Sequence, residues 1–142
     1  MTRRVFREHC LRMMFCISFY EEEEERIEQI ERYLELEEEA EEESFSVEVI
    51  KLSERDKLKK RMEDIIGSIG YIDEKLAEVT TGWSLKRIGR VELGILRIAC
   101  YEMKFDSNIV ASIAINEAVE LAKKYAGDEA HSFVNGVLAK LV

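Results

Sequence analysis

Apolar residues recur every three or four positions along most of the chain, the spacing of an α-helix that buries one face. The longest such stretch is residues 83–105. A brief alternation of apolar and polar residues at 45–52 has no second strand candidate nearby, so it is interpreted as a connecting loop. The pattern therefore predicts an all-α fold of about seven helices. They are expected over residues 3–20, 21–36, 53–69, 71–79, 83–105, 113–126 and 128–141.

The predicted helices begin at polar residues and break near glycines. Some side chains can accept hydrogen bonds from the free backbone amides of a first turn, and the predicted N-caps of this kind are Thr2, Ser53, Ser84 and Asp128. We expect Gly70 to cap or kink a helix, and Gly89 to permit a break or a close helix crossing. Asn135-Gly136 would signal a hairpin between strands, but its flanks keep the helical period, so it is placed inside the last helix.

Composition narrows the class of protein. The chain has 142 residues, of which 46% are hydrophobic and 36% charged, with no proline. No apolar stretch approaches the ~18 residues of a membrane span, and no secretory leader is expected. The three cysteines (Cys10, Cys16 and Cys100) cannot all pair within the chain, which favours a reducing cytoplasm. We therefore expect a cytoplasmic protein with a single domain over residues 1–142 and no membrane association.

The net charge of −9 is unevenly distributed. Residues 21–43 hold 14 glutamates against two arginines, whereas residues 1–12 hold four arginines against one glutamate. The glutamate run is interpreted as a solvated acidic arm and not as a metal site, because hard cations need carboxylates that converge from several directions. Within this arm, residues 37–43 lack an apolar stripe and are predicted to be a mobile connection. Local patches decide affinity, so the acidic total does not exclude nucleic acid binding.

No combination of catalytic or metal-ligating residues stands out. The sequence has no glycine-rich phosphate loop, no Ser-His-Asp candidate in a nucleophile-like context and no paired-cysteine metal spacing. Cys10 and Cys16 would point to nearly opposite faces of one helix, and a histidine-based metal centre would have only His9 and His131. We therefore predict no catalytic residue, no metal and no cofactor, and hence no enzyme.

A cluster of arginines opens the chain. Arg3 and Arg7 share a helix face at a spacing of four residues, and Arg4 lies beside them. Positive charge at a helix start costs about 0.3–1 kcal/mol against the helix dipole, so a role other than helix stability is expected. Guanidinium groups offer planar forks of donors to phosphate oxygens and also stack on bases. The cluster by itself is a weak indication of RNA binding, because a basic N-terminus is also a common solubilising feature.

Several longer runs resemble a known family. Residues 114–125 read AINEAVELAKKY and are followed at 133–138 by FVNGVL, and residues 92–102 read ELGILRIACYE. Together with RRVFRE at 3–8 and Trp83, these runs resemble the NusB family of bacterial transcription antitermination factors. The resemblance implies an all-helical fold of two small lobes.

The resemblance also implies a function in transcription. Members of this family bind a single-stranded boxA-type element of ribosomal RNA leader transcripts, together with a small-subunit ribosomal protein. The heterodimer then joins RNA polymerase and other Nus factors and suppresses premature termination. Whether the free protein is a monomer or a homodimer stays open, because an apolar partner-binding face can self-associate.

Two sets of contact residues follow. The residues expected to bind RNA are Arg3, Arg4, Arg7, Lys123, Lys124, Glu129, His131 and Phe133. The residues expected to bind the ribosomal protein are Phe15, where the family usually has tyrosine, and Glu92. Phe133 would stack on an unpaired base, a contact worth ~1–3 kcal/mol. The stretch 128–132 would offer backbone donors at a helix start.

Simpler structural roles stay open for several of these residues. Phe133 has the spacing of a core residue in a helix, and Lys123-Lys124 has that of a solvated pair near a helix C-terminus. Glu92 could be a plain surface charge. Arg97 and Glu102 are expected to form ion pairs within the fold rather than a site.

Two other functions also stay open. The chain could be a protein-interaction module that binds a basic protein through its acidic arm. It could also be the N-terminal RNA-binding fragment of a ribosomal RNA cytosine methyltransferase, although 142 residues leave no room for the Rossmann-like catalytic domain that such an enzyme needs.

Overall fold

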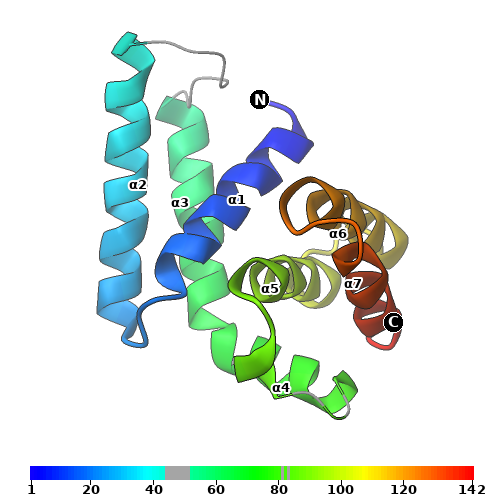
Figure 1. Cartoon of the computed structure of the whole chain (residues 1–142). Helices are drawn as coiled ribbons and strands as arrows, with labels where there is room; N and C mark the ends of the chain where they lie inside the picture. The colour runs from blue at the N-terminus through cyan, green and yellow to red at the C-terminus, as the bar shows by residue number, and fades with distance from the viewer. Residues whose placement is uncertain (44–51, 81, 83) are drawn as a thin grey trace. The chain divides into compact units, whose positions relative to one another are not determined.

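The computed structural model describes the backbone of residues 1–43, 52–80, 82 and 84–142, and their side chains except at 38–43 and 52. Within these residues there are seven α-helices, one short 3₁₀ helix and no strand (Figure 1), which confirms the predicted all-α fold. The helices are α1 (Arg3–Ile17), α2 (Glu23–Glu43), α3 (Leu52–Gly67), α4 (Ile69–Val79), η1 (Leu85–Arg87), α5 (Arg90–Phe105), α6 (Ala111–Tyr125) and α7 (Ala130–Ala139). The expectations for the loop at 45–51 and for Trp83 lie outside the described residues.

The chain divides into two compact units, Met1–Gly67 and Ser68–Val142, called here the N-terminal and C-terminal units. In the N-terminal unit, α1, α2 and α3 pack against one another in all three pairs. The apolar stripes predicted for these helices supply most of its buried side chains, which include Leu11, Met14, Ile30, Leu34, Leu58, Met62 and Ile65; Met13 is buried as well. No helix among the described residues is long and apolar enough to cross a bilayer.

The acidic segment is helical from Glu23 to Glu43. The prediction that residues 37–43 are a mobile connection was wrong, because α2 continues to Glu43. Two buried residues four positions apart, Ile30 and Leu34, anchor α2 in the N-terminal unit. Glutamate is a good helix former, and the acidic first turn at residues 23–25 is favourable at the positive end of the helix dipole. The high helix propensity of glutamate therefore extends α2 beyond the last residue of its apolar stripe.

In the C-terminal unit, α5 packs against α4, α6 and α7, and α6 and α7 pack against each other. Its fully buried side chains include Ile72, Leu76, Ile95, Leu96, Ala122, Val134 and Leu138. Asn135 and Gly136 lie within α7, as the helical period of their flanks predicts. Lys104 near the end of α5 donates to the carbonyl oxygen of Leu141 at 3.0 Å, which ties the C-terminal residues to α5.

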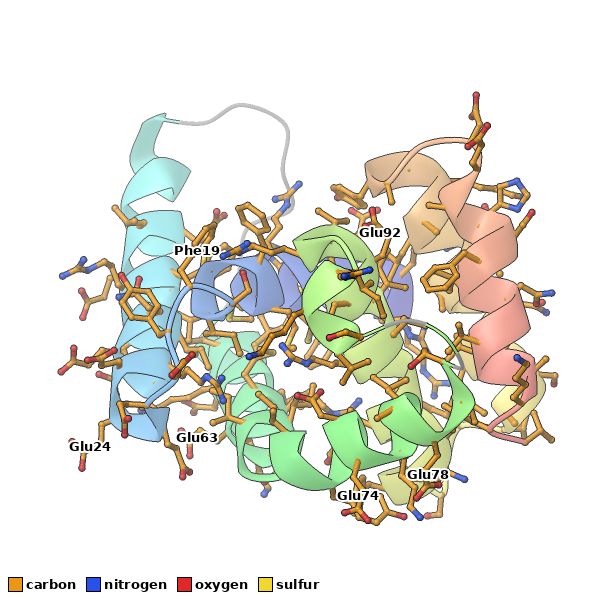
Figure 2. The ribbon with its side chains drawn as sticks, turned by 60° about the horizontal axis from the view of Figure 1, so that its bottom comes forward. Phe19, Glu24, Glu63, Glu74, Glu78 and Glu92 are labelled. Carbon is orange, nitrogen blue, oxygen red and sulfur yellow. The ribbon has the colours of Figure 1, made fainter. Side chains whose placement is uncertain are left out.

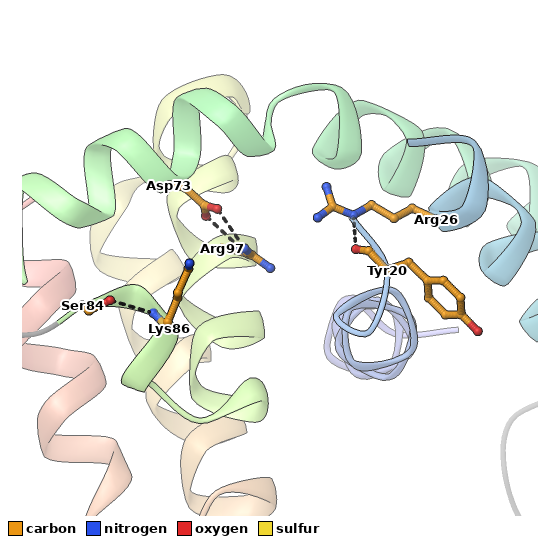
Figure 3. A network of polar contacts seen from close by, with 6 residues as sticks. All are labelled: Tyr20, Arg26, Asp73, Ser84, Lys86 and Arg97. Carbon is orange, nitrogen blue, oxygen red and sulfur yellow. Dashed lines mark hydrogen bonds and ion pairs between the residues drawn. The ribbon is translucent and has the colours of Figure 1, made fainter. Parts of the chain in front are cut away.

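A bidentate ion pair joins α4 to α5. Arg97 donates from Nε and Nη2 to the two carboxylate oxygens of Asp73, at 2.9 and 2.8 Å (Figure 3). The two side chains are 12% and 29% exposed, so the pair is largely withdrawn from water. The prediction that Arg97 forms an ion pair within the fold is confirmed.

Two of the predicted N-caps are confirmed. The amide of Val5 donates to Oγ1 of Thr2 at 3.1 Å, and the amide of Lys86 donates to Oγ of Ser84 at 3.3 Å (Figure 3). The predicted break at Gly89 is also present, because Gly89 is the N-cap residue of α5 and η1 precedes it.

Three other helix boundaries differ from the prediction. α3 already begins at Leu52, so Ser53 lies inside the helix. The break between α3 and α4 falls at Ser68, and Gly70 lies within α4. α7 begins at Ala130 and not after Asp128: Gly127 has φ +92°, a left-handed turn that favours glycine, and the chain needs two more residues before the helix starts.

The cysteines are structural. Cys10 and Cys100 are buried and Cys16 is partly buried, and all three are free thiols. Burial raises the pKa of the Cys100 thiol to about 11 and raises that of Cys16 as well. This confirms the expectation that the cysteines are core or boundary residues.

Candidate nucleic-acid interface

The arginines that open α1 differ in exposure. Arg3 and Arg4 are exposed, whereas Arg7 is only 7% exposed and interacts with other groups of the protein. A buried guanidinium needs partners within the fold, so its donors are less available to a ligand. Thr2 caps the first turn of α1, and this cap fixes the backbone from which the side chains of Arg3 and Arg4 extend. The exposed part of the basic cluster is therefore the Arg3–Arg4 pair.

A buried polar contact supports α1 from the side of α2. Nδ1 of His9 lies 2.7 Å from the hydroxyl oxygen of Tyr33. Burial lowers the pKa of His9 and raises that of Tyr33, so both side chains are neutral near pH 7. Residues of α1 that face inward therefore hold the helix in place, which leaves its exposed residues for binding.

An exposed aromatic pair lies at the C-terminal end of α1. Phe15 is 42% exposed and Phe19, just beyond the helix, is 57% exposed. Their ring centroids are 5.3 Å apart with an interplanar angle of 90°, an edge-to-face contact. Phe15, the residue expected to contact a protein partner, is thus presented together with a second ring that sequence reasoning did not single out. The spacing of four residues between the two rings was a signal that could have found it.

In the C-terminal unit, Phe133 of α7 separates two small hollows. One, of about 280 Å³, is lined by Arg87, Ile88, Gly89, Glu92 and Phe133. The other, of about 240 Å³, is lined by Val79, Thr80, Ser132, Phe133, Gly136, Val137 and Lys140. Phe133 is the one residue that lines both, and its ring is neither fully buried nor fully exposed. Both hollows are smaller than the ~300–1,000 Å³ of a typical small-molecule pocket, so they suit one group of a longer ligand.

The carboxylate of Glu92 lies against the start of its own helix. Glu92 is in the first turn of α5 (Figure 2), and a Cβ atom at Gly89 would collide with its carboxylate oxygen. A negative charge is favourable there because the free amides of the first turn carry partial positive charge. The absence of a side chain at Gly89 is what makes room for the carboxylate.

The other predicted RNA-binding residues of the C-terminal unit line neither hollow. Lys123 pairs with Glu120 at 3.6 Å, and the ammonium group of Lys124 lies 5.4 Å from the ring centroid of Tyr125. Glu129 is exposed and His131 is partly buried, and neither lines either hollow. Among the described residues, no group of three or more histidine, cysteine, aspartate or glutamate side chains could hold a metal ion.

The structure therefore brings together two of the ten predicted residues, Phe133 and Glu92, at one hollow. It adds two cations that sequence reasoning missed, Arg87 and Lys140. Lys140 follows Phe133 by seven residues, the spacing of two helical turns, so helix periodicity could have found it. Arg87 had a weaker signal, the local run of basic residues at 86–90.

These features define a class of protein: a small protein, all-helical over its described residues, that presents exposed cationic side chains and aromatic rings, groups that bind nucleic acids and other proteins. Within that class the chain belongs to the NusB family, whose family model matches residues 4–142.

Curated relatives extend over the full length of the chain. It is 43% identical over 142 residues to the transcription antitermination protein NusB of Lachnoclostridium phytofermentans, a match that covers 100% of this chain and 99% of that protein. It is 36% identical over 143 residues to the NusB protein of Clostridium botulinum strain Kyoto, with 100% of both chains covered. The resemblance inferred from residues 3–8, 83, 92–102, 114–125 and 133–138 is therefore confirmed.

Solved structures share the fold. The chain matches NusB of T. maritima with a TM-score of 0.79 and 26% identity, covering 99% of this chain and 90% of that one. It also matches a chain in the crystal structure of a plectonemic RNA supercoil, with a TM-score of 0.75, 25% identity, and coverage of 98% and 92%. NusB is a family of non-enzymatic transcription factors that act in antitermination.

Proposed function

We propose that this protein binds a single-stranded boxA-type element of ribosomal RNA leader transcripts together with a small-subunit ribosomal protein. The complex joins RNA polymerase and other Nus factors in the cytoplasm and suppresses premature termination of ribosomal RNA transcription. The observation that carries the RNA part of this proposal is the position of Phe133, an incompletely buried ring between two hollows that each contain a cation. The similarity to a chain in the crystal structure of an RNA supercoil also supports RNA binding.

The chemistry of these surfaces suits a single strand. An unpaired base exposes both of its faces, and a ring such as Phe133 can stack on one of them for ~1–3 kcal/mol. Arg3 and Arg4, both exposed on α1, can donate to phosphate oxygens or base edges. Lys123, Lys124, Glu129 and His131 are kept as a second group of RNA contacts near the end of α6 and the start of α7. Arg7 is assigned mainly to supporting α1, because it is buried.

The protein partner is proposed to contact Phe15 and Glu92. Exposed aromatic rings are frequent anchors of protein interfaces, and the Phe15–Phe19 pair offers two in contact. Glu92 can pair with a basic side chain of the partner. In the absence of the partner the same rings can meet in a homodimer, a state that sedimentation of the free protein would detect.

Fluorescence-anisotropy titration of a labelled boxA-like single strand tests the proposal, with and without the ribosomal protein and at two salt concentrations. We expect binding that tightens with the partner. The double variant Arg3→Gln/Arg4→Gln should weaken binding and reduce the salt slope by roughly 1.4, about 0.7 for each lost phosphate contact. The matched control is Lys57→Gln/Lys60→Gln, which removes two exposed charges from α3.

Two outcomes would contradict the proposal. If the Arg3/Arg4 variant and the Lys57/Lys60 control have the same salt slope, the α1 arginines are not phosphate contacts. If the folded wild-type protein does not bind RNA even with the partner present, RNA recognition is wrong. The exposed glutamates of α2 would then become the candidate surface for a basic protein.

A further inference from the structure

We propose that the RNA strand crosses the C-terminal unit along a defined track, with one phosphate held by Arg87, a base on the ring of Phe133, and a second phosphate held by Lys140. This inference rests on the proposed RNA-binding function and adds two contact residues and a path to it. It follows from the two hollows, which share Phe133 and contain one cation each.

The two cations are available to a ligand. Arg87 and Lys140 are both exposed, and within the described part of the chain neither side chain forms an ion pair or a hydrogen bond. Lys123 differs, because it already pairs with Glu120 at 3.6 Å. A cation without a carboxylate partner keeps its donors for a phosphate, and the charge-assisted bonds that result are stronger than neutral ones.

The shape of the Lys140 hollow suits an inserted group. Phe133, Gly136 and Lys140 recur at helical spacing along one side of α7, and Val79 and Thr80 at the end of α4 line the hollow as well. A Cβ atom added to Gly136 would meet nothing within 4 Å, so open space lies directly above the helix backbone. The distance from Phe133 to Lys140 along the helix axis is about 10 Å, the scale of a short run of nucleotides.

Glu92 is the one carboxylate among the residues that line the two hollows, and it would repel a phosphate. Its carboxylate, however, is folded over Gly89 and compensated by the amides at the start of α5. It forms no ion pair with Arg87, which therefore keeps its full charge for the RNA. The geometry thus separates the two functions of this hollow: Arg87 for the phosphate and Glu92 for the protein partner.

The test compares RNA affinities of single variants of the full chain, using the same labelled boxA-like strand. Arg87→Gln and Lys140→Gln should each weaken binding roughly threefold to tenfold at low salt and lower the salt slope by about 0.7. The matched control is Lys86→Gln, which removes the same charge from the neighbouring exposed residue of η1 that lines neither hollow. Gly136→Leu should weaken binding by filling the second hollow, and melting curves establish that each variant is folded.

The outcomes separate this inference from the proposed function. If the wild-type protein binds RNA but Arg87→Gln and Lys140→Gln behave like Lys86→Gln, the track is wrong and the proposed function stands. If the wild-type protein does not bind RNA, both are overturned. If Gly136→Leu does not fold, Arg87→Gln and Lys140→Gln still test the track, because these substitutions at exposed residues leave the core unchanged.

Discussion

The Arg97–Asp73 ion pair should contribute measurably to the stability of the C-terminal unit. Its two hydrogen bonds are 2.9 and 2.8 Å long and the side chains are 12% and 29% exposed. Exposed ion pairs contribute about 0–1 kcal/mol, whereas loss of one partner from a fully buried pair costs about 3–5 kcal/mol. This pair lies between those limits, so we expect Arg97→Met to lower the free energy of unfolding by about 2 kcal/mol. Methionine keeps most of the apolar stem in place, so the change reports mainly on the guanidinium group.

A double-mutant cycle isolates the interaction itself. The cycle uses Arg97→Met, Asp73→Ala and the double variant, with free energies from urea unfolding, and we expect a coupling energy of about 1–2 kcal/mol. The control cycle uses Lys60→Met and Asp64→Ala. In that pair one ammonium group lies 3.5 and 3.2 Å from the two carboxylate oxygens, and the side chains are 78% and 43% exposed. It should give only about 0.3–0.5 kcal/mol. If the two cycles give equal coupling energies, the bidentate geometry and burial of the Arg97–Asp73 pair do not strengthen it, and the reasoning is wrong.

Three further predictions follow from burial and backbone conformation. Gly136→Ala should raise the free energy of unfolding by about 0.5–1 kcal/mol, because a Cβ atom fits there without contact; Gly70→Ala, near the start of α4, should raise it less. Urea unfolding checks both, and a destabilised Gly136→Ala would contradict the open space seen at α7. Burial lowers the pKa of His9, so the unfolded chain binds the proton more readily. Stability should therefore be complete above about pH 6.5 and fall as the pH drops below it. His9→Gln should flatten this dependence between pH 5.5 and 7.5, and an unchanged slope would show that other groups cause it. Cys100, buried and with its pKa raised to about 11, should react with a thiol reagent more slowly than the partly buried Cys16. Equal rates in the native protein, measured by mass spectrometry of labelled peptides, would contradict this.

The glutamates of α2 illustrate how the apolar pattern can underestimate a helix. The apolar stripe weakens after Leu36, and on that ground residues 37–43 were expected to be a mobile connection. The helix nevertheless reaches Glu43. Ile30 and Leu34 are buried against the rest of the N-terminal unit, and once a helix has started, each further residue with good propensity extends it at little cost.

Phe133 illustrates the opposite case, in which the sequence supplied the residue and the fold supplied its surroundings. Its spacing was equally compatible with a core position and with a stacking platform. The ring is only partly buried and lines two hollows. Lys140 lies two helical turns along from Phe133, whereas Arg87 and Glu92 come from η1 and α5, and no local pattern in the sequence places those two beside the ring.

The sequence by itself determined the all-α fold, the caps at Thr2 and Ser84, and the family. These depend on periodicity, on contacts within a few residues, or on contiguous motifs, all of which are local properties of the chain. Only the tertiary structure decided that Arg7 is buried while Arg3 and Arg4 are exposed. It alone also decided that Arg87 lies beside Phe133, because burial and proximity arise when segments distant in sequence pack together.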